Sequence, residues 1–148
     1  MNRRNLVQSA ALALAAGATF LIAANAQGTG ATGQKHHKIV VQVSDNDPVK
    51  WNLALNNAKN LQDDVGAANV DVEIVAYGPG IDMLKLDAPV SNRVGDAARG
   101  GVKVLACQNT MRGQKLTKED MSPAVGYVPS GAAEIMIKQG EGWAYLRP

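Results

Sequence analysis

The sequence predicts an α/β fold in a single domain, with a five-stranded, mostly parallel sheet and helices on both faces. Two observations predict this class. Short apolar segments rich in valine recur along the chain, and segments with a helical spacing of apolar residues separate them. Strands that alternate with helices imply parallel pairing and right-handed crossovers. The length of 148 residues, 46% of them hydrophobic and 19% charged, fits one such domain.

The first half of this domain is expected to hold two strands and one long helix. Residues 39–43 are almost entirely apolar, which is typical of a strand covered on both faces. Residues 70–76 alternate between apolar and acidic side chains at their start, which favours a strand at an edge of the sheet. Between them, Pro48 suits the first turn of a helix. Apolar residues at spacings of 3, 4, 3 and 4 predict its inner face, namely Trp51, Ala54, Ala58, Leu61 and Val65.

Three further strands are predicted in the second half, at residues 102–106, 125–128 and 143–146. Helical segments are predicted at residues 81–86, at residues 89–99, within residues 108–121, and after Ser130. The last helix carries four apolar or small residues on one face, Ala133, Met136, Ile137 and Gly140. We expect a flavodoxin-like strand order for the whole sheet.

Residues 1–26 have the three parts of a cleavable export signal. Arg3 and Arg4 supply the positive charge, residues 10–24 are uncharged and mostly apolar, and Ala24-Asn25-Ala26 is a small-x-small cleavage pattern. The apolar run is shorter than the roughly 20 residues that a bilayer core requires. We therefore expect cleavage after Ala26 and no membrane span in the mature protein.

The export route and the destination follow from the same segment. Arg3-Arg4 with Leu6 and Val7 resembles a twin-arginine motif, although Asn2 is not the usual Ser or Thr, so the general secretory route stays open as well. Both routes lead to the bacterial cell envelope, most simply the periplasm. Residues 27–37 are rich in Gly, Thr and Ala and are expected to form a flexible lead-in to a domain at residues 38–148.

Composition excludes several functions. Cleavage removes two of the 15 basic residues and no acidic ones, which leaves 13 of each sign and no basic surface for nucleic acid. One cysteine excludes an internal disulfide and an all-cysteine zinc cluster. The two histidines, His36 and His37, are neighbours in the lead-in and do not form a set of metal ligands. No phosphate-binding glycine motif follows a strand, and we expect neither a metal nor a cofactor.

Cys107 is the one residue whose position suggests chemistry. It directly follows the predicted third strand, and ligands of open parallel sheets bind beyond the carboxyl ends of the strands. Asn109 or Thr110 is suited to cap a following helix, which would bring unpaired backbone N–H groups near the sulfur and favour the reactive thiolate. The alternative is an inert core residue, because free cysteine is among the most buried residue types.

Three segments of this chain can be compared with known families. They are the apolar strand after Lys38, the segment Cys107-Gln108-Asn109-Thr110-Met111, and the ending Gln139-Gly140-Glu141-Gly142-Trp143-Ala144-Tyr145. Together they resemble the DsrE/DsrF-like family from about Lys38 to the C-terminus. The resemblance implies a parallel α/β subunit that assembles into homo-oligomers, often trimers or hexamers. It also implies that Cys107 carries sulfur as a persulfide, as in the sulfurtransferase components of the family, which are cytoplasmic, whereas this chain carries an export signal.

Two functions are therefore expected as alternatives. In the first, Cys107 accepts or transfers sulfane sulfur from small sulfur species, with Asn109 and Thr110 stabilising the anion; whether this amounts to an enzyme stays open. In the second, the protein is a non-catalytic module of the periplasm that binds a small ligand or forms a homo-oligomer. Its ligand would lie at the strand ends, near Asn46, Gly78, Asn109 and Thr110.

Overall fold

A computed structural model describes residues 36–148 of the chain. The export signal expected at residues 1–26, and all but the end of the lead-in expected at residues 27–37, lie outside the described residues. Within residues 36–148, no helix combines the length and apolar character needed to cross a membrane.

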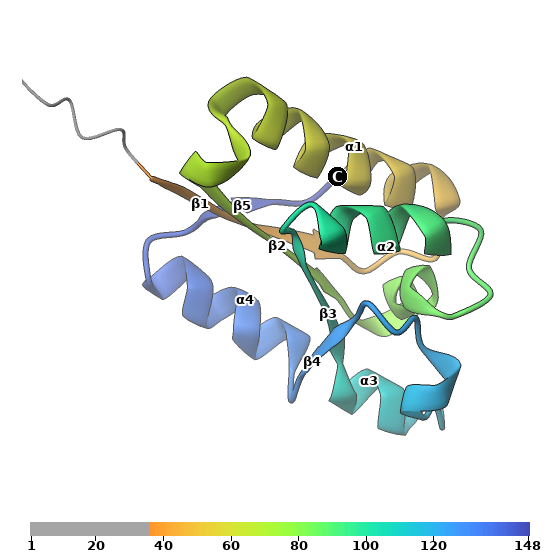
Figure 1. The fold of residues 1–148 in the computed structure, drawn as a ribbon. Coiled ribbons are helices and arrows are strands. Elements are labelled where there is room, and N and C mark those ends of the chain that lie inside the picture. The colour runs from red at the N-terminus through yellow and green to blue at the C-terminus, as the bar shows by residue number, and fades with distance from the viewer. Residues whose placement is uncertain (1–35) are drawn as a thin grey trace, which may run out of the picture. The chain divides into compact units, whose positions relative to one another are not determined.

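Five strands form one sheet in the order β4-β3-β2-β1-β5 (Figure 1). They are β1 (His37–Val43), β2 (Val70–Ala76), β3 (Lys103–Cys107), β4 (Gly126–Val128) and β5 (Ala144–Leu146). All four pairings are parallel, and β1 and β2 pair over their full length. The predicted α/β class is confirmed, with a sheet that is parallel throughout.

Helices cover both faces of this sheet, as predicted (Figure 1). α1 (Pro48–Val65) and α2 (Ser91–Arg99) lie on one face, and α4 (Gly131–Gly140) lies on the other. The Asp47 side chain caps α1 by accepting the N–H of Val49 at 2.8 Å. The short α3 (Gln108–Gly113) follows β3 directly, and single 3₁₀ segments lie at Ala67–Asn69, Gly78–Leu84 and Lys118–Asp120.

The strand order differs from the flavodoxin-like prediction. A flavodoxin-like sheet places the second strand at an edge, whereas here β2 lies between β1 and β3 and β5 takes the edge beside β1. The acidic residues of β2 are accommodated by partners. Asp71 contacts His36 at 3.0 Å, and Glu73 is buried beneath α4, with Lys138 at 3.9 Å. The acidic start of this strand therefore does not mark an edge, because Asp71 contacts His36 and Glu73 is buried beneath α4.

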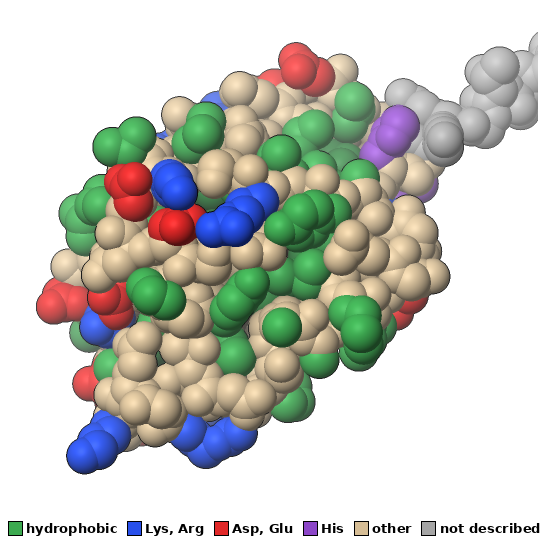
Figure 2. Space-filling model, turned by 180° about the vertical axis from the view of Figure 1, so that it is seen from behind, with side chains coloured by type: hydrophobic (Ala, Val, Ile, Leu, Met, Phe, Trp, Pro, Cys, Tyr) green, Lys and Arg blue, Asp and Glu red, His purple; other side chains and the backbone are tan. Residues whose placement is uncertain are grey.

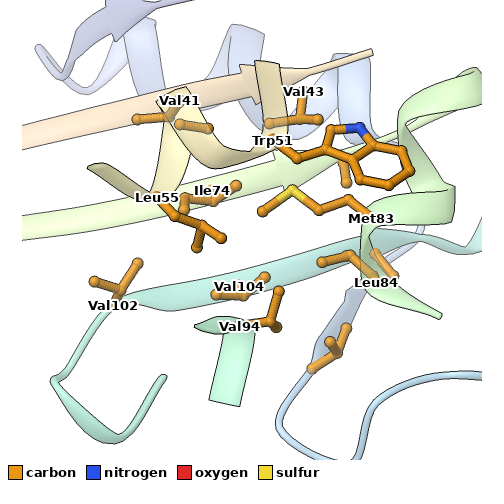
Figure 3. Close-up of a cluster of buried hydrophobic side chains, with 14 of the residues drawn as sticks. Val41, Val43, Trp51, Leu55, Ile74, Met83, Leu84, Val94, Val102 and Val104 are labelled. Carbon is orange, nitrogen blue, oxygen red and sulfur yellow. The ribbon is translucent and has the colours of Figure 1, made fainter. Parts of the chain in front are cut away.

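The larger hydrophobic core lies between the sheet and the α1–α2 layer. Figure 3 shows Val41, Ile74 and Val104 of the sheet packing toward Trp51 of α1 and Val94 of α2. Trp51 is a core residue, as predicted, and its ring N–H donates to a backbone carbonyl at 2.7 Å. Burying one such side chain contributes roughly 1.5–3 kcal/mol relative to leaving it exposed, so the larger cluster is the main source of hydrophobic stabilisation of the sheet.

The core on the α4 face is smaller and contains Val40, Val75, Val128, Ile135 and Trp143. Ile135 is the buried residue of α4 here, whereas Met136 and Ile137 are 66% and 49% exposed. The face predicted for this helix is therefore not the one that covers the sheet. The helix is turned so that the side with Gly131 and Ile135 faces inward, and Lys138 on the same side approaches the buried Glu73.

Candidate functional site at the carboxyl edge of the sheet

The carboxyl edge of the sheet brings the chain around Cys107 together with two other connections. Cys107 is the last residue of β3 and pairs in register with Val128 of β4, which leads into α4. The connection after β2 reaches the same place, because the N–H of Gly78 donates to Oγ1 of Thr110 at 2.9 Å. This is the edge at which open parallel sheets bind ligands.

Two glycines permit this close approach. Gly78 has a φ of 54°, a left-handed conformation that side chains other than glycine disfavour. At Gly131, a Cβ would lie 3.0–3.2 Å from atoms of the Tyr77 side chain. Ser130 caps α4, with its hydroxyl oxygen accepting the N–H of Ala133 at 3.4 Å. The first turn of α4 is thus held against the segment after β2.

The Cys107 sulfur lies in this junction as a free thiol that is only 4% exposed. Burial by itself raises the pKa of the thiol, because it disfavours the charged form. The hydroxyl of Thr110 and the N–H groups of Gly131, Thr110 and Asn109 act in the opposite direction. These donors outweigh burial and lower the pKa of Cys107 below its ordinary value, so the thiolate is favoured.

The donors are not equivalent. The N–H of Asn109 also donates to the carbonyl of Pro129 at 3.1 Å and is therefore shared. Oγ1 of Thr110 already accepts the Gly78 N–H, which leaves the hydroxyl hydrogen free to point at the sulfur. The N–H of Thr110 belongs to the first turn of α3 and is a smaller influence than the Gly131 N–H. We therefore assign the main stabilisation of the thiolate to the Thr110 hydroxyl and to the Gly131 N–H of α4.

Three of the four predicted ligand-binding residues lie at this junction. Asn109 and Thr110 are in the first turn of α3, and Gly78 contacts Thr110. α3 begins at Gln108, so neither Asn109 nor Thr110 caps it; Cys107 itself is the N-cap residue. Asn46 is instead engaged elsewhere, where its side-chain amide donates to Oδ2 of Asp82 at 2.9 Å.

Gly131 belongs to the site and was not predicted from the sequence as a site residue, whereas Tyr77 lies in the loop Tyr77–Gly80 that the sequence placed along the ligand crevice. The pattern Pro129-Ser130-Gly131 predicted a helix start, and the structure confirms it. It did not indicate that the start of this helix lies next to Cys107, because that depends on the pairing of β3 with β4. The side chain of Arg112, at the end of α3, donates to Oδ1 of Asn109 and places a positive charge beside the site.

Residues that ligate metals do not gather in the part of the chain that the structure describes. Within residues 36–148 there is no group of three or more His, Cys, Asp or Glu side chains placed to hold a metal ion. His36 instead contacts Asp71. The chemistry that the junction itself offers is that of a stabilised thiolate with hydrogen-bond donors around it.

Residues 23–148 match the DsrE/DsrF-like family. The chain therefore belongs to the DsrE/DsrF-like family, which is associated with sulfur relay. No protein with a curated description matches the chain.

Two solved structures are similar to this one. A protein of unknown function from Methanobacterium thermoautotrophicum, MTH1491, has 34% sequence identity and a TM-score of 0.72, over 76% of this chain and 99% of that one. A conserved protein of unknown function from Bacteroides thetaiotaomicron, BT1422, has 12% identity and a TM-score of 0.58, over 75% and 94% of the two chains. The second likeness shows the fold alone.

Proposed function

We propose that Cys107 accepts sulfane sulfur, holds it as a persulfide and passes it to an acceptor. The observation that carries this proposal is a cysteine that is 4% exposed and yet has a lowered pKa, because donors from two helices favour its thiolate. Thiolate is the form that attacks sulfur. Membership of a family associated with sulfur relay supports the same function.

The proposed step is an exchange between a thiolate and a polysulfide anion. The Cys107 thiolate attacks the terminal sulfur atom, and an S–S bond forms to the protein. The bond behind that sulfur breaks, and its electron pair leaves with a polysulfide one atom shorter. No external oxidant is consumed, because the step forms one S–S bond and breaks one S–S bond. An acceptor thiolate then removes the sulfur by the same exchange.

The surroundings of Cys107 suit a small anion. The Thr110 hydroxyl and the Gly131 N–H, which favour the thiolate, would favour the terminal sulfur anion of a persulfide as well. The low exposure of Cys107 favours small sulfur species over bulky donors.

Cyanide tests the transfer, because it removes sulfane sulfur as thiocyanate. The protein is incubated with polysulfide, freed of excess reagent and treated with cyanide. We expect thiocyanate at up to one equivalent per chain from the wild type and none from Cys107→Ser. Equal release from both proteins would overturn the proposal.

As a second candidate, we propose that the protein is a non-catalytic module that assembles into a homo-oligomer, either a trimer or a hexamer. Three large apolar side chains, those of Met136 and Ile137 on α4 and of Tyr145 on the adjacent β5, are 66%, 49% and 43% exposed. Figure 2 shows hydrophobic side chains gathered across the middle of one face of the molecule. β5 is also an edge strand, and an exposed edge beside apolar side chains favours contact with another chain.

Native mass spectrometry of the mature protein tests this assembly. We expect three or six chains per particle, and fewer after Ile137→Lys, which places a charge on the exposed side of α4. A monomeric wild type would contradict the proposal. If Cys107 takes up no sulfur while the assembly forms, the non-catalytic module is the function that remains.

We also propose that the protein acts in the periplasm after loss of residues 1–26. The support is the sequence of that segment, with its paired arginines, apolar run and Ala24-Asn25-Ala26. The intact mass of protein from the periplasmic fraction is expected to equal that of a chain that begins at Gln27. Recovery of a mass that includes residues 1–26 would contradict cleavage.

A further inference from the structure

The helix that follows Cys107 ends in a backbone conformation that usually belongs to glycine. Lys115 has a φ of 58°, and among residues 36–148 it is the one residue other than glycine with a positive φ. Its N–H donates to the carbonyl of Arg112 at 3.2 Å. The N–H of Leu116 donates to the carbonyl of Met111 at 2.8 Å, which completes a Schellman motif after α3.

Lys115 occupies the position of this motif at which glycine is the usual residue. A side chain is strained there because its Cβ approaches the backbone too closely. A lysine at this position therefore lowers stability relative to a residue without a Cβ. What the lysine supplies in return, and glycine could not, is a positive charge at the end of α3.

The chain around Lys115 carries positive charge that is not balanced by ion pairs. Residues 107–118 contain Arg112, Lys115 and Lys118 and no acidic side chain. Within residues 36–148, none of these three side chains forms an ion pair. Arg112 and Lys115 are both exposed to solvent. Their charges are therefore available to an anion that approaches this part of the surface.

The carboxylates at the same edge of the sheet already have partners. The ion pairs there are Asp45 with Lys50, Asp82 with Lys85, and Glu134 with Lys138. Asp120, which follows the basic segment, accepts hydrogen bonds from the N–H and the hydroxyl of Thr117. The unpaired charges of Arg112 and Lys115 therefore leave an excess of positive charge beside the candidate site.

Two hydrogen bonds hold this basic segment against the residues that surround Cys107. The Arg112 side chain turns back along α3 and donates to Oδ1 of Asn109, in the first turn of the helix. Nε2 of Gln114 donates to the carbonyl of Gly78 at 3.2 Å, on the connection after β2. Figure 1 shows α3 directly beyond the end of β3. The basic segment is thus fixed at the carboxyl edge of the sheet.

We propose that Arg112 and Lys115 form a cationic entrance to Cys107, which selects small anionic sulfur donors such as polysulfide over neutral reagents. This inference rests on the proposed function in that Cys107 is the reacting group. Positive charges beside a site raise the local concentration of anions and the rate at which they arrive. Arg112 and Lys115 act on this approach and take no part in the exchange of S–S bonds.

Iodoacetate and iodoacetamide test the entrance, because they alkylate a thiolate by the same reaction and differ chiefly in charge. The ratio of their rate constants at Cys107 cancels the pKa and the accessibility of the thiol. Arg112→Gln and Lys115→Gly are each expected to lower the iodoacetate-to-iodoacetamide ratio by about two- to fivefold at low salt. At about 1 M salt the variants and the wild type should converge, because the charges are screened.

Two control variants separate this effect from a general change in charge or structure. Lys59→Gln removes an exposed positive charge from α1, away from α3 in Figure 1, and should keep the wild-type ratio. Lys115→Arg keeps the charge and should keep the ratio as well. Lys115→Asn repeats the test with a residue that tolerates this conformation.

The thermal stability of Lys115→Gly gives an independent readout. We expect a melting temperature equal to or higher than that of the wild type, because glycine removes the strain at this position. A purely structural role for Lys115 predicts the opposite, namely a lower melting temperature and an unchanged ratio of rate constants.

A ratio that either Arg112→Gln or Lys115→Gly leaves unchanged, or that falls equally in Lys59→Gln, would overturn the proposal. The rate of sulfur uptake from polysulfide is measured in the same variants. If the wild type takes up no sulfur while the ratio falls as expected, the persulfide function fails and the cationic entrance stands. If sulfur is taken up and the ratio does not respond, the entrance alone fails.

Discussion

The backbone N–H of Gly78 donates to Oγ1 of Thr110 at 2.9 Å and thereby links the segment after β2 to the helix that follows β3. With its oxygen engaged in this way, the Thr110 hydroxyl directs its hydrogen toward the Cys107 sulfur and lowers the pKa of the thiol. The reactivity of Cys107 therefore depends on the backbone N–H of Gly78 in the connection that follows β2.

Thr110→Val removes the hydroxyl and keeps the size of the side chain. A hydrogen bond to a charged group contributes about 1.5–3 kcal/mol, so we expect a higher pKa for Cys107 and alkylation by iodoacetamide at neutral pH that is slower by about tenfold. Thr110→Ser restores the donor and should keep the wild-type pH profile. Identical profiles for the Val and Ser variants would show that the hydroxyl does not act on the sulfur.

Gly131→Ala tests the donor supplied by α4. The new Cβ would lie 3.0–3.2 Å from Tyr77 side-chain atoms, so either Tyr77 or the first turn of the helix must shift. We expect the pKa of Cys107 to rise, as measured by thiolate absorbance against pH. Gly140→Ala is the matched control at the other end of α4, where a Cβ meets nothing within 4 Å. A rise of equal size in both variants would contradict the role of Gly131.

Glu73→Gln should change how stability depends on pH. Burial raises the folded-state pKa of Glu73, so the folded protein binds this proton more tightly than the unfolded chain. The stabilisation is complete below the unfolded-state pKa and is lost as the pH rises through the folded-state pKa. We expect the variant and the wild type to converge in acid. The variant should be more stable above that range, by about 0.5–3 kcal/mol, the usual size of single-residue effects.

Urea unfolding across pH measures this difference. Asp64→Asn, at an exposed residue of α1, is the control and should follow the wild type at neutral pH. A Glu73→Gln protein that loses stability at high pH would contradict the raised pKa of Glu73, because it would mean that the ionised carboxylate is held favourably.

Ile74→Ala tests the interior position of β2. Ile74 is 0% exposed between the sheet and α1, and truncation of such a residue costs about 2–5 kcal/mol. Leu86→Ala, at a residue that is 58% exposed, should stay within about 0.5 kcal/mol of the wild type. Equal free energies of unfolding for the two variants would contradict the burial of this strand.

The class of fold could be predicted from the sequence because its pattern is local. Valine-rich runs indicate the buried strands, and the spacing of apolar residues from Trp51 onward indicates α1. Both patterns depend only on which face of a single strand or helix is buried. The strand order could not be obtained in this way. Asp71 and Glu73 indicate an edge strand until their partners are known, and Lys138 is 65 residues away from Glu73 in the chain.

The candidate site could likewise be predicted only where its residues are close in sequence. Cys107, Asn109 and Thr110 lie within four positions, and their place after a strand predicted a site at the carboxyl edge of the sheet. Gly78 also lies there, but the pairing with Thr110 was not predictable. Gly131 joins them only because β4 pairs with β3 and delivers the start of α4 to Cys107. Asn46 follows the strand end too, yet its side chain is engaged by Asp82.

Intact mass spectrometry after exposure to polysulfide is the most direct test of the central claim that Cys107 carries sulfane sulfur. The mature protein, prepared without reductant, is expected to gain whole sulfur atoms that a reductant removes. Cys107→Ser should gain none. A wild-type mass that stays unchanged, or a gain that persists in Cys107→Ser, would contradict the account.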